Sequence, residues 1–306
     1  MTDTTRSTPA RTAGMFAIVT LWVVLVSAGP AAQSWHAQYF PNVELTTQTG
    51  ASVHFYDLIK GKTVAIELIY TTCQFACPLE TARLAQVQDL LGDRMGKDVF
   101  FLSITIDPAH DTPAVLRAFA DKYHAGPGWT FLTEDLDLLS KKLGLYSTPD
   151  PENKDGHIPA LLIGNEATGQ WMRGSALDNP KMTATMIVNW MGGYGTASPV
   201  KMTTTQKPLT FTSGEYLFSI KCSACHSLGQ ETKIGPNLAG ITHTRERQWL
   251  AKYIADPDQM LKAGDPIAKE LFARYQQMRM PNLQLSAEQV ADLIAFIDSI
   301  PPASSK

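Results

Sequence analysis

The pentapeptide Cys222-Ser223-Ala224-Cys225-His226 constrains this chain more than any other feature. Two thiols separated by two residues and followed directly by an imidazole form the C-x-x-C-H signature of covalent c-type haem attachment. The thiols lie about one helical turn apart, so each can reach one vinyl group of the same porphyrin. The pattern predicts one haem c, held by Cys222 and Cys225 through thioethers and by His226 as an axial ligand of the iron.

The sequence after this motif offers the second axial ligand. Residues 234–238 resemble the Gly-Pro-x-Leu loop that packs on the histidine side in small monohaem cytochromes c, and Met278 and Met280 are the candidate ligands. Met280 precedes Pro281, which disfavours helical backbone at Met280, and it matches the Met-Pro ligand of that family. We therefore predict Met280 as the ligand. Met278 is expected at the end of the preceding helix, as a core methionine.

Helical patterns surround the haem motif. Three residue pairs have the spacing of N-terminal capping signals: Thr212 with Glu215, Asp265 with Pro266, and Ser286 with Gln289. Apolar residues at helical spacing follow the last two pairs. Residues 209–306 are therefore predicted to form an all-α cytochrome c domain with a single haem.

The other two cysteines form a second motif. Cys73 and Cys77 follow an apolar run at 63–70, predicted to be a buried strand, and precede a predicted helix at 79–91. A helix N-terminus stabilises thiolates through its dipole. The four-residue separation places both sulfurs on one side of a turn, where they can form a disulfide or chelate one soft metal ion.

Four segments between Phe40 and Trp190 resemble the Sco/SenC family of copper-binding, thioredoxin-like proteins. In order, they are Cys73-x-x-x-Cys77-Pro78; residues 103–108 with 111–113; residues 129–133 running into 142–145; and His157 before an apolar strand at 161–163. The resemblance implies an α/β thioredoxin-like domain over residues 36–191, with a central mixed sheet flanked by helices.

The resemblance also implies a ligand set for one copper ion: Cys73, Cys77 and the distant His157. Thiolates are soft ligands that select Cu(I), and imidazole suits either oxidation state of copper. His157 stands one residue later than the histidine of the family, because this chain reads Asp155-Gly156-His157. Asp107 lies in a motif of the family and is expected near the thiols, either with a functional role or as a turn residue.

The element order supports the same fold. Predicted strands at 63–70, 99–106 and 160–163 are separated by predicted helices near 79–91, 112–123 and 136–143. A hairpin turn is predicted at 165–169, and Asn179-Pro180 is expected to open a last helix.

The N-terminal segment has the pattern of a targeting sequence. Arg6 and Arg11 precede an apolar run at 15–26, followed by small residues. Residues 1–32 are predicted to be either a cleaved signal peptide or a membrane anchor with its N-terminus in the cytoplasm. Both domains would then lie in the periplasm. Residues 192–208, rich in Gly, Thr, Pro and Ser, are predicted to be a linker.

The charge balance argues against one class of partner. The 306 residues include 26 Lys and Arg against 29 Asp and Glu, which gives a net charge of −3. Nucleic-acid binding requires a basic surface, so we expect no nucleic-acid partner.

Three functions remain open. The first is a copper chaperone that loads the copper-bearing subunit of a cytochrome oxidase, with the haem exchanging electrons with a redox partner protein. The second is a thiol–disulfide oxidoreductase acting on the oxidase cysteines, which would be an enzyme. The third is a plain electron carrier. A haem and a copper ion each exchange one electron, whereas a disulfide requires two, so the sequence favours the first function. The third function leaves Cys73 and Cys77 without a role.

Overall fold

The computed structural model describes residues 1–2, 35–134, 137–145, 159–191, 211–229 and 233–302. The predicted targeting segment, His157 and the predicted linker lie outside these ranges. The chain divides into two units, residues 1–33 and 34–306, and both cysteine motifs lie in the second.

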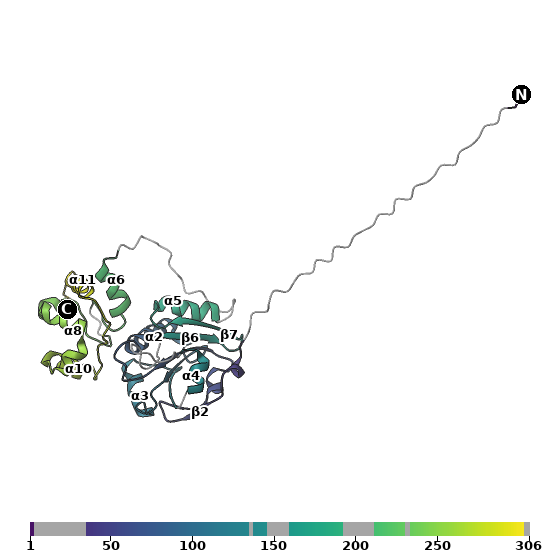
Figure 1. Cartoon of the computed structure of the whole chain (residues 1–306), viewed down its shortest axis with the longest axis horizontal. Coiled ribbons are helices and arrows are strands. Elements are labelled where there is room, and N and C mark those ends of the chain that lie inside the picture. Colours follow the sequence, from purple (N-terminus) through teal and green to yellow (C-terminus); the bar gives the residue numbers. More distant parts are fainter. Residues whose placement is uncertain (3–34, 135–136, 146–158, 192–210, 230–232, 303–306) are drawn as a thin grey trace. The chain divides into compact units, whose positions relative to one another are not determined.

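A mixed seven-stranded sheet forms the centre of the first domain (Figure 1). The strand order is β2-β1-β5-β4-β3-β6-β7. The strands are β1 (Glu44–Thr47), β2 (Ser52–His54), β3 (Thr63–Ile69), β4 (Val99–Thr105), β5 (Trp129–Thr133), β6 (Ala160–Asn165) and β7 (Gln170–Ser175). Strand β4 runs parallel to β3 and β5, and β6 runs antiparallel to β3. Every residue of β3 is buried, as expected for a central strand covered on both faces.

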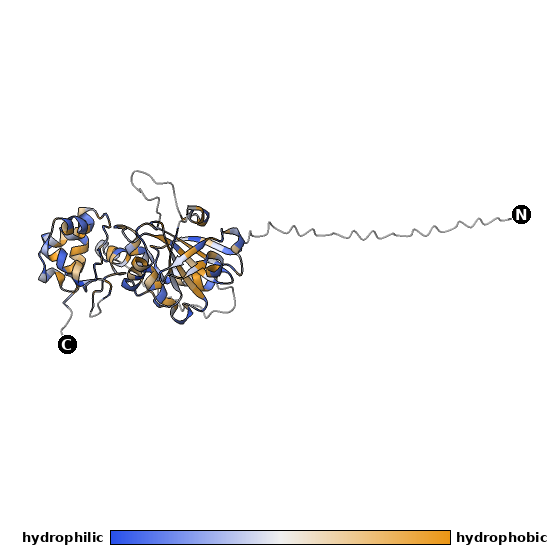
Figure 2. Cartoon of the chain, turned by 90° about the horizontal axis from the view of Figure 1, so that it is seen from below, coloured by the Kyte–Doolittle hydropathy of each residue, from blue (hydrophilic) through white to orange (hydrophobic). Residues whose placement is uncertain are grey.

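Helices cover both faces of this sheet. Helices α2 (Cys77–Leu91), α3 (Pro113–Lys122) and α5 (Pro180–Thr185), which continues as a π-helix at Met186–Met191, pack on one face with Ala65 of β3. Helices α1 (Phe55–Ile59) and α4 (Asp137–Leu143) pack on the other face with Val64 and Ile66. Neighbouring residues of β3 therefore serve opposite cores, as the two-residue period of a strand requires. Figure 2 shows the hydrophobic residues concentrated in the strands.

The predicted α/β fold is confirmed, with one omission at its centre. The predicted strands at 63–70, 99–106 and 160–163 are β3, β4 and β6, and the three predicted helices are α2, α3 and α4. The prediction missed β5, which lies between β1 and β4. Its short sequence, Trp-Thr-Phe-Leu-Thr, alternates only over its first three residues, and four of its five residues are buried. Strands β1 and β2 were also missed. The hairpin turn predicted at 165–169 joins β6 to the antiparallel β7.

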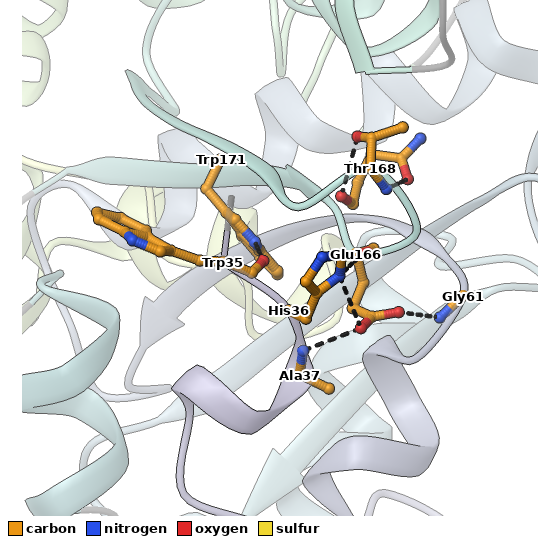
Figure 3. Close-up of polar contacts among 8 residues, drawn as sticks. Trp35, His36, Ala37, Gly61, Glu166, Thr168 and Trp171 are labelled. Atoms are coloured by element: carbon orange, nitrogen blue, oxygen red, sulfur yellow. Dashed lines mark hydrogen bonds and ion pairs between the residues drawn. The ribbon is translucent and has the colours of Figure 1, made fainter. Parts of the chain in front are cut away.

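Glu166 fastens the start of the first domain to the turn between β6 and β7 (Figure 3). Its carboxylate accepts hydrogen bonds from the backbone N–H groups of Ala37 (2.9 Å) and Gly61 (2.6 Å). Trp171 Nε1–H donates to the carbonyl of Trp35 over 2.5 Å. Burial acts to raise the pKa of Glu166, but the two backbone donors outweigh it and lower the pKa. These contacts are structural, and they join segments that are more than a hundred residues apart.

All regular elements described between residues 211 and 302 are helical, which confirms the predicted all-α domain. They are α6 (Ser213–Leu217), continuing as a π-helix at Phe218–Cys222, α7 (Ile241–Thr244), α8 (Arg247–Ala255), α9 (Pro257–Lys262), α10 (Pro266–Arg274) and α11 (Ala287–Asp298). Ser286 and Gln289 form the predicted capping box, and Asp265 caps α10 through the N–H of Ala268 at 2.8 Å. Gly214 permits the close crossing of α6 and α11, since a Cβ there would lie 2.1 Å from the carbonyl oxygen of Asp292.

None of the helices in the described ranges is long and apolar enough to cross a membrane.

Candidate functional site

The first cysteine pair lies at the turn from β3 to α2. Cys77 is the first residue of α2, two residues earlier than predicted, and Pro78 occupies the first turn. Cys73 lies in the preceding loop, where its N–H donates to the carbonyl of Tyr70 at 3.2 Å. The two residues are reduced and not joined by a disulfide; 6% of Cys73 is exposed and Cys77 is fully buried. The pair therefore occupies the N-terminal end of a helix, as predicted, with one sulfur more accessible than the other.

The two thiols have very different acidities. A hydrogen bond from the Cys77 side chain lowers the pKa of Cys73 to about 5, aided by backbone donors at Phe75 and Cys77 and opposed by burial. Burial, together with the hydrogen bond and negative charge of Cys73, raises the pKa of Cys77 well above its usual range. At neutral pH the site holds one thiolate, on Cys73, and one neutral thiol. Such a thiolate is both a nucleophile and a soft metal ligand.

Asp111 fixes the loop that leads to Cys73. Its fully buried carboxylate accepts hydrogen bonds from the N–H of Thr71 (3.0 Å), the hydroxyl of Thr71 and the hydroxyl of Thr105 (2.5 Å). Asp107, for which the sequence left a functional role or a turn role open, pairs with His110 at 2.9 Å on the exposed side of the turn, and this hydrogen bond raises the pKa of His110. The signal for Asp111 was its place in residues 111–113, which belong to the second of the four segments that resemble the Sco/SenC family.

Two buried carboxyl groups lie behind the cysteine loop, and the sequence analysis did not single them out. Glu67 on β3 and Glu80 on α2 are each 1% exposed. Glu67 Oε1 accepts a hydrogen bond from the hydroxyl of Ser103 at 2.6 Å, while Oε2 has no hydrogen-bond partner among the described residues. Burial raises the pKa of Glu67 to about 8 and also raises that of Glu80. Both acids are therefore neutral at pH 7 and add no negative charge beside the Cys73 thiolate.

Only two of the three predicted copper ligands belong to the residues that the structure describes. Cys73 and Cys77 lie together, but His157 is outside the described residues. Within the ranges that the structure covers, no group of three His, Cys, Asp or Glu side chains is placed to hold a metal ion.

The second cysteine pair follows a short helix, as predicted. Cys222 ends the π-helical segment, and the N–H groups of Cys225 and His226 donate to its carbonyl at 3.1 and 2.9 Å. The side chain of Cys222 and its neighbour Ala224 are buried. Burial raises the pKa of both cysteines to about 12, so they are neutral thiols.

The imidazole of His226 is oriented by its own loop. Its Nδ1 lies 2.8 Å from the carbonyl oxygen of Pro236, and because a carbonyl only accepts, the proton is on Nδ1. Nε2 then keeps its lone pair for a metal, the arrangement typical of metal-binding histidines. Burial lowers the pKa of His226, which favours this neutral form. Gly235 is required beside the ring, since a Cβ there would lie 2.7 Å from Cε1 of His226.

The cavities around His226 fit a haem. One of about 360 Å³ is lined by Cys222, His226, Leu238 and Met280, and a smaller one of about 70 Å³ is lined by Cys225, His226 and Met280. His226 and Met280, the two residues predicted to hold the haem iron, thus border both spaces. The linings are mainly apolar, and they contain both thiols that would form the thioethers.

The two methionine candidates differ in which cavities they line. Met280 lines both cavities, whereas Met278 lines only the smaller one. The prediction that Met278 ends a helix is wrong, because α10 ends at Arg274 and residues 278–285 have no regular secondary structure. Met278 instead accepts a hydrogen bond at Sδ from the hydroxyl of Tyr123, over 3.5 Å.

The loop of the first cysteine motif meets the segment that follows Met280 within the unit 34–306. The N–H of Asn282 donates to the carbonyl of Gln74, which lies between Cys73 and Cys77, over 3.0 Å. Pro78, next to Cys77, lines the smaller cavity beside His226.

Helix α2 makes a second set of contacts with the haem-binding segment. The Arg83 guanidinium donates to the carbonyls of Ser219 (3.1 Å) and Ile220, and Gln86 donates to the carbonyl of Ser223 (3.3 Å). The same helix therefore carries Cys77 at its start and holds the segment before Cys222 on its side.

Comparison with known protein families agrees with these two sites. Residues 31–157 match the SCO1/SenC family model, and residues 211–301 match the cytochrome c family model. The chain carries a SCO1/SenC domain followed by a cytochrome c domain. The resemblance based on the cysteine motifs is thereby confirmed, and the thioredoxin-like fold class with it.

Individual relatives match a part of this chain. Protein SenC of Rhodobacter capsulatus is 36% identical over 107 residues, which are 35% of this chain and 40% of that protein. The SCO1 protein homolog of Bacillus subtilis is 34% identical over 124 residues, 38% of this chain and 63% of the relative. The structure of Bradyrhizobium japonicum ScoI with copper bound has 23% identity and a TM-score of 0.41, and the match covers 50% of this chain and 99% of that one. This chain thus spans less than two thirds of the first two relatives.

Proposed function

We propose that this protein is a periplasmic copper-binding chaperone for the copper centre of a cytochrome oxidase, with a fused c-type haem that transfers single electrons. SCO1/SenC proteins bind copper and take part in cytochrome oxidase assembly. The observation that carries the proposal is the contact between the two sites: the carbonyl of Gln74, inside the Cys73–Cys77 loop, accepts the N–H of Asn282, two residues after Met280.

Copper is the cargo of the first domain in this proposal. The Cys73 thiolate binds it first, and Cys77 loses its proton when the metal arrives, because a cationic metal favours the deprotonated ligand. His157 is the proposed third ligand. Two thiolates and one imidazole form a soft donor set that selects Cu(I). The neutral Glu67 and Glu80 leave the negative charge of the site on the sulfur atoms.

Haem c is the resident cofactor of the second domain. Cys222 and Cys225 would hold its vinyl carbons, and His226 and Met280 its iron. When bound, the haem supplies one-electron redox chemistry. The chain's own residues orient it: Pro236 fixes the imidazole through Nδ1, and the apolar lining excludes water from the ring.

A thiol–disulfide oxidoreductase is the second candidate, and one observation favours it. The low pKa of Cys73 beside the high pKa of Cys77 is the asymmetry of a dithiol in which one sulfur attacks and the other resolves. Its two-electron step does not match a single haem, so it ranks second. A plain electron carrier ranks last, because it leaves this polarised thiol pair without a role.

The remaining elements of the proposal concern setting and organisation. The arginine-flanked apolar run at 15–26 and the thioether chemistry both support the periplasm, with residues 1–32 as signal peptide or anchor. We propose domain limits of 36–191 and 209–306, joined by the linker 192–208. The proposed partners are the copper-bearing oxidase subunit and a redox protein.

The test follows haem absorbance in the full-length protein. Mixing the reduced protein with Cu(II) should oxidise the haem in a fast phase, as one electron passes from Fe(II) to Cu(II) to give Fe(III) and Cu(I). The rate should not depend on protein concentration, and the Cys73→Ser/Cys77→Ser variant should lose the fast phase and the tightly bound copper. A fast phase that persists in this variant, or a rate proportional to protein concentration, would refute electron transfer between the two sites.

A further inference from the structure

Tyr123 is a buried polar residue that the proposed chemistry does not use. It follows the C-terminal end of α3, is 1% exposed, and packs against Phe119 with ring centroids 4.8 Å apart. Its hydroxyl is its only polar side-chain group, and it donates to Sδ of Met278, 155 residues further along the chain. Buried tyrosine hydroxyls are normally paired, and here the partner is a thioether beside the haem cavity.

Met278 begins the non-helical segment that contains Met280. One residue, Arg279, separates Met278 from Met280, Pro281 follows, and the N–H of Asn282 then donates to the carbonyl of Gln74. The first domain therefore holds this segment at both ends, by Tyr123 at Met278 and by the cysteine loop at Asn282. Met280 lies between the two contacts.

Tyr123 also lines the smaller of the two cavities beside His226. The cavity of about 70 Å³ is lined by Pro78, Tyr123, His226, Met278 and Met280. Burial raises the pKa of Tyr123 well above its usual range. The phenol therefore stays protonated and keeps its donor at any pH the protein meets.

We propose that Tyr123 is a positioning residue for the haem: its hydroxyl holds Met278 and so fixes the segment that presents the Met280 thioether to the iron. The inference rests on the proposed function, because it takes Met280 as the axial ligand. Its consequence is that a residue of the copper-binding domain sets the ligation and the redox potential of the haem in the other domain. Thioether ligation raises the potential of a haem, so a loosened Met280 lowers it.

The experiment compares Tyr123→Phe with Tyr56→Phe in the full-length holoprotein. Both changes remove one hydroxyl and keep the ring. Tyr56 lies on α1 and donates to the carbonyl of Phe40 over 3.0 Å, in the core on the other face of the sheet. Tyr123→Phe should weaken the iron–thioether charge-transfer band of the ferric haem and lower the reduction potential of the haem. Tyr56→Phe should match the wild type in both.

Two further variants distinguish a failure of the positioning role from a failure of the ligand assignment. Met278→Leu removes the acceptor and leaves Tyr123 intact, so it should reproduce the Tyr123→Phe changes even if that variant folds poorly. Met280→Ala should abolish the band. If it does, and Tyr123→Phe or Met278→Leu keeps the wild-type band and potential, the positioning role is refuted while the ligand assignment stands. If the band survives in Met280→Ala, the ligand assignment fails instead.

Discussion

The backbone N–H of Thr71 donates to Oδ2 of Asp111 over 3.0 Å, which ties the loop before Cys73 to the turn after β4. The same carboxylate accepts the hydroxyls of Thr71 and Thr105. We expect Asp111→Ala to lower the free energy of unfolding by about 3 kcal/mol, since it leaves the buried donors of Thr71 and Thr105 without an acceptor. It should also weaken Cu(I) binding, because the Cys73 loop loses its anchor. Urea unfolding and competition with a Cu(I) chelator would measure the two effects.

Asp107→Ala is the matched control, because it removes the other aspartate of the same segment. Asp107 pairs with the exposed His110, and its loss should change neither stability nor copper affinity appreciably. Equal effects of the two substitutions would contradict the anchoring role of Asp111.

The different roles of Asp111 and Asp107 could not be predicted from the sequence. Both residues stand in the segment that suggested the family, and nothing in their spacing says which one turns inward. The answer depends on Thr71, 40 residues earlier. Tyr123 and Met278 are 155 residues apart, and their contact likewise follows from the tertiary fold alone.

Local sequence patterns, by contrast, correctly predicted the elements next to both cysteine pairs. The signals for the N-terminal ends of α10 and α11 are also local, so Asp265 and Ser286 were correctly identified as N-caps. Glu67 was overlooked because a single acid within an apolar run does not alter the prediction of a buried strand. Its protonation depends on the helices packed over β3.

Glu67 should make stability depend on pH. Its pKa is about 8 in the folded protein, against 4.5 for an ordinary glutamate. A raised pKa means that the folded protein holds a proton which the unfolded chain releases above pH 4.5. This contribution to stability is complete below that pH and is lost as the pH rises towards 8, at on the order of 1.4 kcal/mol per pH unit.

Glu67→Gln isolates this effect from the other titrating groups. The amide keeps an acceptor for Ser103 and cannot ionise. Its free energy of unfolding, minus that of the wild type, should therefore rise between about pH 5 and 8. Urea titrations across this range would measure the difference, and a constant value would show that Glu67 is ionised in the folded protein.

The polarised thiol pair predicts selective alkylation of Cys73. In holoprotein without copper, Cys222 and Cys225 are blocked by the haem, so only the first pair can react. Cys73 should be modified by a small haloacetamide at a rate that rises with a midpoint near pH 5, its pKa in the folded protein. Cys77 should stay unmodified, since burial keeps it a neutral thiol. Mass spectrometry of the peptides reads out both sites.

Cys77→Ala tests the cause of this shift. It removes the hydrogen bond that contributes most to lowering the pKa of Cys73, so the midpoint should move up by one pH unit or more, about 1.4 kcal/mol for each unit. A midpoint that stays near 5 would assign the shift to the backbone donors at the start of α2 instead.

Gly235 provides the last prediction, which concerns the haem. A Cβ at this position would lie 2.7 Å from Cε1 of His226. Gly235→Ala should therefore push the imidazole away from the Pro236 carbonyl and misalign Nε2, at a cost of about 1–3 kcal/mol for overpacking. Gly229→Ala is the control, because a Cβ at that position meets nothing within 4 Å. Haem content per chain and the low-spin ferric spectrum should both fall in Gly235→Ala and stay unchanged in Gly229→Ala. A wild-type spectrum in Gly235→Ala would show that the loop shifts to admit the methyl group and that Gly235 does not determine the position of the ring.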